Sequence, residues 1–107
     1  MALHHYSPGE VASLSTPPGG LESLHTHALA KTDRFEAIRL IVPAAGAIAS
    51  HAVPGLVTLH CLTGKVHLQR TDGTVVMKEG DWVHLSPGEQ HSLQGCERAS
   101  LLMMIIF

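Results

Sequence analysis

The stretch GDWVHLSPGEQH, residues 80 to 91, consists of a short strand pattern between two turns, followed by a histidine. Gly80 and Asp81 are typical turn residues, and the Pro87-Gly88 pair is typical of a tight turn. The segment WVHLS between them alternates polar and apolar side chains with a period of two residues, which predicts a strand over 82–86. His91 follows the second turn and begins the next predicted strand. The role of His91 therefore depends on which side of that strand its side chain faces.

Similar short runs rich in Val, Ile, Leu and Thr follow one another along the chain, separated by Gly, Pro and Asp residues. They lie at 35–42, 47–53, 56–62, 65–70, 74–78, 82–86, 91–94 and 100–107. The Asp72-Gly73 pair between two of these runs predicts a β-hairpin, and no segment has a convincing helical period. About eight short strands with such turns predict an all-β sandwich or closed barrel, because an isolated small sheet leaves one apolar face and two edges uncovered.

The first part of the chain has a different character. Residues 1–34 contain SPGE and STPPGG and few periodic apolar positions, which predicts an irregular N-terminal arm with one short strand around 22–30. With 107 residues the chain is long enough for one domain of ordinary size but not for two. We therefore expect a β-barrel over 35–107, with the arm packed on the same domain or on a dimer partner.

Composition and charge exclude several classes of function. The net charge is −2, and the seven Lys and Arg residues are scattered, so the chain has no basic footprint for nucleic acid. The N-terminus lacks a signal-peptide pattern, and the longest apolar run, LLMMIIF, is far too short to span a membrane. The two cysteines, Cys61 and Cys96, form neither a C-x-x-C pair nor a disulfide framework. We expect a cytoplasmic protein with free thiols that binds neither nucleic acid nor membrane.

Two segments together resemble the paired motifs of the cupin superfamily: GAIASHAVPGLVTLHCLTG, residues 46–64, and the opening stretch, residues 80–91. His51 corresponds to the first histidine of the family, although four residues rather than five separate it from Gly46. His91 corresponds to the last histidine, with Ser86 where the family usually has proline and Pro87 directly after it. The resemblance covers about residues 35–107 and implies a small single-domain, RmlC-like jelly-roll barrel.

The resemblance also implies a candidate metal site. In metal-binding cupins two histidines two residues apart, a glutamate and a later histidine bind one divalent ion such as Fe, Mn, Ni or Zn, and alternate strand residues share a face. His51 and His91 match the first and last ligands. The second histidine position is Val53, and the glutamate position is Val57, or Leu56 if the register slips by one residue. Because aliphatic side chains cannot bind a metal, the resemblance implies a degenerate metal site at His51 and His91.

Five further histidines can be judged from their patterns. His25 and His27 have the i, i+2 spacing of a ligand pair, and would join the site only if the arm covered the barrel mouth or crossed a dimer. The alternative is an exposed polar arm. His60, His67 and His84 alternate with apolar neighbours, so we expect them on the outer faces of their strands.

The same alternation predicts which residues face the interior. If residues 51, 53, 57 and 91 point inward, then Leu59 and Cys61 do so as well. The predicted ligand pocket is His51, Val53, Leu56, Val57, Leu59, Cys61 and His91.

Three functions are compatible with this pocket. The first is binding of a small, fairly apolar molecule, with His51 and His91 as polar anchors. The second is a metal-dependent cupin enzyme of dioxygenase or isomerase type, and the third is a structural role with a filled interior. Templates such as G-x-S-x-G and H-E-x-x-H are absent, so no residue receives a catalytic role. The C-terminal run SLLMMIIF is apolar on both faces, which favours a homodimer.

Overall fold

The computed structural model describes residues 4–107, and the side chains of all of these except Ser50 and His51. The described residues form strands, turns and loops, and they contain no helix long and apolar enough to cross a membrane. The strands are β1 His27–Lys31, β2 Phe35–Val42, β3 Ala47–His51, β4 Leu56–Arg70, β5 Gly73–Lys78, β6 Trp82–Leu85 and β7 His91–Ile106. The all-β prediction is confirmed.

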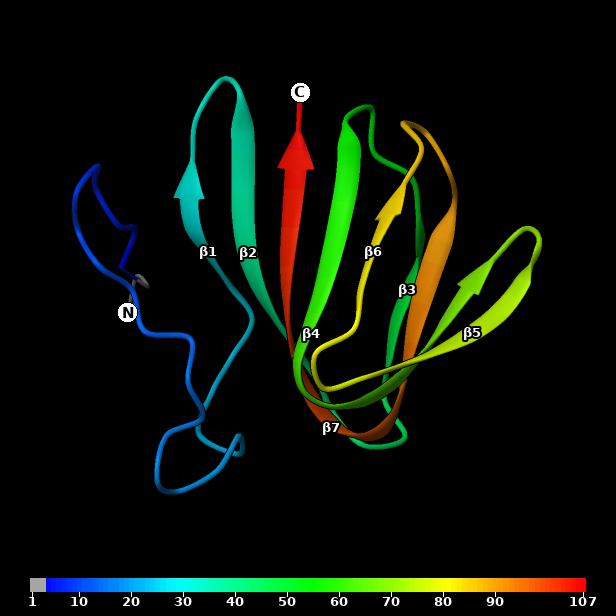
Figure 1. Ribbon diagram of the computed structural model, residues 1–107, viewed down its shortest axis with the longest axis horizontal. Coiled ribbons are helices and arrows are strands. Elements are labelled where there is room, and N and C mark those ends of the chain that lie inside the picture. Colours follow the sequence, from blue (N-terminus) through cyan, green and yellow to red (C-terminus); the bar gives the residue numbers. More distant parts are fainter. Residues whose placement is uncertain (1–3) are drawn as a thin grey trace.

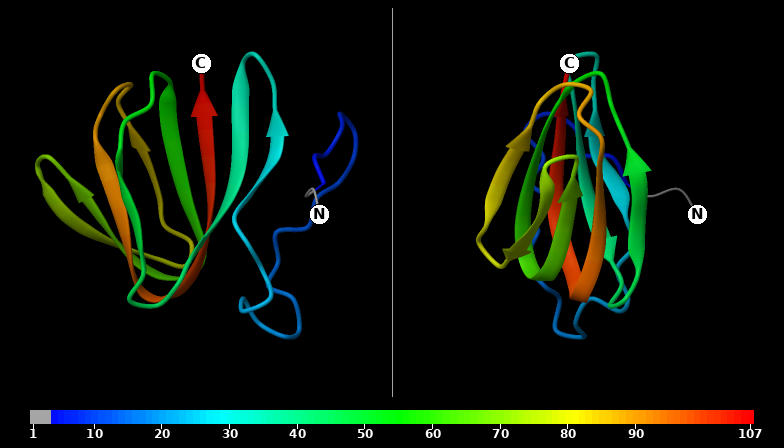
Figure 2. Two further views of the ribbon diagram at one scale, coloured as in Figure 1. Left: turned by 180° about the vertical axis from the view of Figure 1, so that it is seen from behind. Right: turned by 90° about the vertical axis from the view of Figure 1, so that its right-hand side faces the viewer.

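The strands form two layers that share the long strands β4 and β7 (Figures 1 and 2). In the first layer β2 and the first half of β4 pair with the second half of β7, with β1 and β6 outside them. In the second layer β3 and the second half of β4 pair with the first half of β7, and β5 follows β4. All pairs are antiparallel, as the jelly-roll prediction requires.

The two long strands correct the predicted strand boundaries. The runs at 56–62 and 65–70 are one strand, β4, and the runs at 91–94 and 100–107 are one strand, β7. The residues between these runs lie within the continuous strands. The β4-β7 ladder passes through them with register shifts between Cys61 and Val66, where the strands bend. Gly64 permits this bend, since its φ of 85° disfavours any side chain and a Cβ there would lie 2.3 Å from the carbonyl oxygen of Arg98.

The predicted hairpin is present, with a shifted turn. Arg70 pairs with Gly73 in the ladder of β4 and β5, so Thr71 and Asp72 form the two-residue turn. Gly73, which has a φ of 135°, is the first residue of β5 rather than part of the turn.

The hydrophobic core lies between the two layers. Alternate residues of β4 and β7 are buried there, as the period of two predicted, together with side chains from the neighbouring strands. The core consists of Leu40, Val42, Val57, Leu59, Cys61, Val66, Leu68, Met77, Leu85, Leu93, Ala99, Leu101, Met103 and Ile105. His60 and His67 are half-buried on the side of β4 that points away from the core, and His84 is exposed. The predicted placement of these three histidines is therefore confirmed.

The N-terminal arm packs on β1 and β2 of its own chain. The backbone N–H of Tyr6 donates to the carbonyl oxygen of Leu29 at 2.7 Å. The buried Arg39 of β2 donates from Nη2 to the carbonyl oxygen of Leu14 at 3.0 Å and from Nε to Oγ of Ser100 at 2.9 Å. The strand in this region, β1, begins later than the predicted 22–30.

Candidate functional site

The second layer brings three strand ends together. His51, at the end of β3, is the ladder partner of His91 at the start of β7, and His91 is in turn the ladder partner of Arg70 at the end of β4. The two histidines singled out by the sequence are therefore adjacent across two strands at the level of the backbone. The side chain of His51 lies outside the described part of the structure.

His91 is buried at the end of the core. Its side chain is 2% exposed, and it alternates along β7 with the core residue Leu93 on the same face. The ring atom Nδ1 lies 3.3 Å from the carbonyl oxygen of Glu89. In the tautomer that carries the proton on Nδ1, the ring donates to this oxygen and presents Nε2 as an acceptor.

Glu89 joins the turn before β7 to the end of β4. Its Oε2 accepts a hydrogen bond from Nε of Arg70, and its Oε1 accepts one from the backbone N–H of Ser86 at 3.1 Å. The hydrogen bond from Arg70 holds the pKa of the Glu89 carboxyl below its ordinary value, with a smaller contribution from Ser86. The charged pair thus links the end of β4 to the turn that precedes His91.

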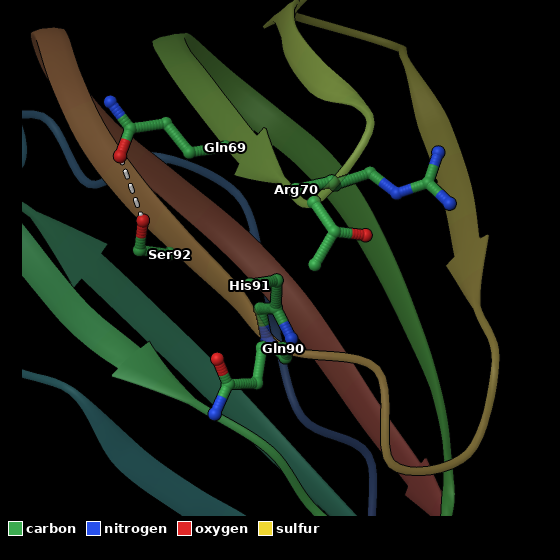
Figure 3. Close-up of a pocket in the computed structure, with 6 residues that line it drawn as sticks. Gln69, Arg70, Gln90, His91 and Ser92 are labelled. Carbon is green, nitrogen blue, oxygen red and sulfur yellow. Dashed lines mark hydrogen bonds between the residues drawn. The ribbon is translucent and has the colours of Figure 1, made fainter.

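A pocket of about 260 Å³ opens at this point (Figure 3). It is lined by Gln69, Arg70, Thr71, Gln90, His91 and Ser92. Oγ of Ser92 donates to Oε1 of Gln69 at 3.0 Å, and Figure 3 shows the Arg70 guanidinium directed away from this pair. All six residues carry polar groups, and His91 is the buried one among them.

Five of the seven residues of the sequence-predicted pocket lie elsewhere in the described structure. Val57, Leu59 and Cys61 are buried side chains of the core, and Val53 packs against that core. Leu56 is half-buried on the other face of β4. None of these five lines the pocket at His91.

Five lining residues were missed by the sequence argument: Gln69, Arg70, Thr71, Gln90 and Ser92. The sequence marked only the two strand ends on which they lie, through the hairpin after Arg70 and the turn before His91. Only the pairing of β4 with β7 identifies His91 as the neighbour.

The residues present do not fit the four-ligand metal site that the resemblance implies, because Val53 and Val57 occupy two of the four ligand positions. Across 4–49 and 52–107, no three His, Cys, Asp or Glu side chains lie close enough together to hold a metal ion. His27 pairs with Arg39 at the far side of β2, and β2 lies between β1 and β7 in the sheet. His25 is exposed in the arm that precedes β1. The arm histidines are therefore on a different part of the fold from His91.

Cys61 is also unsuited to chemistry at this site. Its side chain is fully buried in the core, and burial raises the pKa of its thiol to about 11, with smaller contributions from the carboxylates of Asp81 and Glu79. A thiol that stays protonated at neutral pH is a poor nucleophile. Cys61 is a packing residue.

Comparison with known proteins gives a consistent fold. No family model and no curated protein matches the sequence. A cupin superfamily protein from Desulfitobacterium hafniense is 17% identical with a TM-score of 0.74, over 77% of this chain and 75% of that one. A conserved protein of unknown function from Streptococcus pyogenes is 16% identical with a TM-score of 0.77, over 99% and 96% of the two chains.

An RmlC-like cupin with a double-stranded β-helix fold, from Methanocaldococcus jannaschii, is 17% identical with a TM-score of 0.71, over 76% of this chain and 77% of that one. At such identities the likeness concerns the fold and not the reaction. The chain has the cupin fold that the motifs around His51 and His91 predicted.

Proposed function

We propose that this cupin-fold protein binds a small polar molecule in the pocket at the joined ends of β4 and β7, with His91 as the buried anchor. The observation that carries the proposal is the position of His91: an imidazole that is 2% exposed lines a pocket of about 260 Å³. A buried imidazole with hydroxyl and amide groups around it is an arrangement that orients a small ligand.

The lining favours a neutral ligand. Arg70 is the one formally charged side chain among the six lining residues, and its charge is balanced by Glu89. The other groups are the amides of Gln69 and Gln90, the hydroxyls of Thr71 and Ser92, and the imidazole. Amides and hydroxyls both donate and accept hydrogen bonds, which suits a polyol, a sugar or a small amide better than an anion. This is a more polar ligand than the sequence-predicted pocket suggested.

The test is a titration of isotope-labelled protein with glycerol, glucose and acetamide, followed by amide shifts in NMR spectra. We expect saturable shifts at residues 69–71 and 90–92 for at least one of these probes, and none with acetate or hexane-1-ol. Gln90→Ala should weaken the binding of the saturating probe roughly tenfold, because it removes an amide that would hydrogen-bond the ligand. Gln94→Ala is the matched control, an exposed glutamine of β7 that lies outside the pocket lining.

Two results would contradict the proposal. One is the absence of saturable shifts at the pocket with all three neutral probes. The other is an equal loss of affinity for the probe in Gln90→Ala and Gln94→Ala, since a general loss of stability would then explain the effect of both substitutions.

A further inference from the structure

A second cavity lies between the N-terminal arm and the hairpin formed by β1 and β2. Its volume is about 370 Å³, and it is lined by Tyr6, Ser7, Pro8, Glu10, Ala30, Thr32 and Phe35. The first four of these belong to the arm, and the other three to the end of β1, the turn after it and the start of β2. Figure 1 shows the arm, in blue, beside β1. None of these residues lines the pocket at His91.

Backbone hydrogen bonds hold the arm in place as one wall of this cavity. The N–H of Tyr6 donates to the carbonyl oxygen of Leu29 at 2.7 Å, which attaches the arm to β1. The next residues form a turn in which the N–H of Glu10 donates to the carbonyl oxygen of Ser7 at 3.0 Å. Gly9 in this turn has a φ of 87°, which glycine adopts without strain. The arm is therefore an ordered wall at this point.

Aromatic side chains are concentrated at this cavity. The whole chain contains four Phe, Trp and Tyr residues, and two of them, Tyr6 and Phe35, line it. Both are half-buried, so part of each ring is accessible. Phe35 is fixed by the hairpin turn, where its carbonyl oxygen accepts a hydrogen bond from the N–H of Thr32 at 2.8 Å. Because the face of an aromatic ring is electron-rich, such rings attract organic cations as well as apolar groups.

The charge of the cavity is negative. Among the lining residues that the structure describes, Glu10 is the one with a formal charge. Its Oε1 accepts a hydrogen bond from the backbone N–H of Ser7 at 3.0 Å, and its Oε2 lies 2.6 Å from Nε2 of His4. The hydrogen bond from Ser7, with a smaller contribution from His4, holds the pKa of the Glu10 carboxyl below its ordinary value. The cavity therefore carries a carboxylate at neutral pH.

The lining contains no cation that would balance this carboxylate from within the described residues. Lys31 of the same hairpin is directed to Glu36, with its Nζ 4.0 Å from Oε2, and neither residue lines the cavity. We propose that this cavity is a second ligand site, which binds a small alkylammonium ion with its apolar groups against Tyr6 and Phe35 and its charge toward Glu10. This ligand differs in charge from the neutral one favoured by the pocket at His91.

Three probes of similar shape and different charge test the proposal: tetramethylammonium, tert-butanol and pivalate. Each is titrated into the isotope-labelled full chain, and binding is followed by amide shifts in NMR spectra. We expect saturable shifts at residues 6–10 and 30–35 with tetramethylammonium. tert-Butanol should bind there several-fold more weakly, because it lacks the positive charge, and pivalate should cause no saturable shifts.

Substitutions then assign the two interactions. Glu10→Gln removes the charge and keeps an oxygen that can accept from Ser7, and it should weaken tetramethylammonium binding roughly fivefold. The matched control is Glu22→Gln, an exposed glutamate of the arm outside the lining, which should leave the affinity unchanged. Tyr6→Leu keeps an apolar side chain and removes the ring, and it should cost roughly fivefold through the lost cation–π interaction. Unchanged amide signals of Leu29 in each free variant would show that the arm still packs on β1.

Three results would overturn the proposal. The first is the absence of saturable shifts at residues 6–10 and 30–35 with tetramethylammonium. The second is equal affinity for tetramethylammonium and tert-butanol, which would make the cavity an apolar site without preference for a cation. The third is an affinity for tetramethylammonium that neither Glu10→Gln nor Tyr6→Leu lowers more than Glu22→Gln does.

Discussion

Arg70 and Glu89 are hydrogen-bonded to each other, and this pair joins the last residue of β4 to the turn that precedes β7. The two residues are distant in sequence, and the antiparallel ladder that pairs Arg70 with His91 brings them together. The pair therefore ties the turn before β7 to the end of β4, beside the buried imidazole of His91.

Glu89→Gln should change the pH dependence of stability. The pKa of Glu89 is held below its ordinary value of 4.5 in the folded protein, so its charged form is favoured by folding. This contribution is fully present above pH 4.5 and is lost as the pH falls through the lower, folded pKa. Urea unfolding across pH 7 to pH 3 should show a shallower loss of stability for the variant than for the wild type.

The control for this measurement is Glu79→Gln, an exposed carboxylate in the turn after β5. It should retain the wild-type slope. If Glu89→Gln and the wild type lost stability in parallel below pH 4.5, the ion pair would not be the origin of the acid sensitivity.

Gly64→Ala should destabilise the fold by roughly 3 kcal/mol. Its φ of 85° is unfavourable for alanine, and the new Cβ would lie 2.3 Å from the carbonyl oxygen of Arg98 in the adjacent β7. Chemical denaturation measures the effect. Gly19→Ala in the arm is the matched control, since its Cβ would meet nothing within 4 Å, and equal effects of the two substitutions would refute the explanation.

Cys61 should not react with Ellman's reagent in the folded protein at about pH 8, because its thiol is fully buried and its pKa is raised to about 11. Cys96 is exposed and should react, which gives one rapid thiol per folded chain and two after unfolding. The Cys96→Ser variant should therefore show none before unfolding. Rapid labelling of that variant would mean that the core at β4 opens readily.

Elemental analysis of protein purified without chelator should find Fe, Mn, Ni, Zn and Cu well below one ion per chain. The reason is that Val53 and Val57 occupy two of the four ligand positions implied by the cupin motifs, and two histidines alone bind divalent ions weakly. Near-stoichiometric metal that disappears in the His51→Ala, His91→Ala double variant would contradict this and favour a metal-dependent enzyme.

The sequence by itself determined the fold class and the inside and outside of most strands. Alternation in residues 56–62 and 82–86 has a period of two, which only a strand with one buried face satisfies, and burial of Leu59 and Leu85 agrees with it. The motifs around His51 and His91 predicted the cupin fold because their turn residues recur at fixed positions between the strands. These are local signals, carried by neighbours in the chain.

The tertiary structure alone decided the continuity of β4 and β7 and the composition of the pocket. Whether Gly64 ends a strand or bends it depends on the partner strand beside it, and the ladder with β7 continues through the bend. The pocket combines residues 69–71 with 90–92, and no local pattern in either segment specifies the other. Antiparallel pairing supplies that relation, because register is a property of two strands together and not of either one.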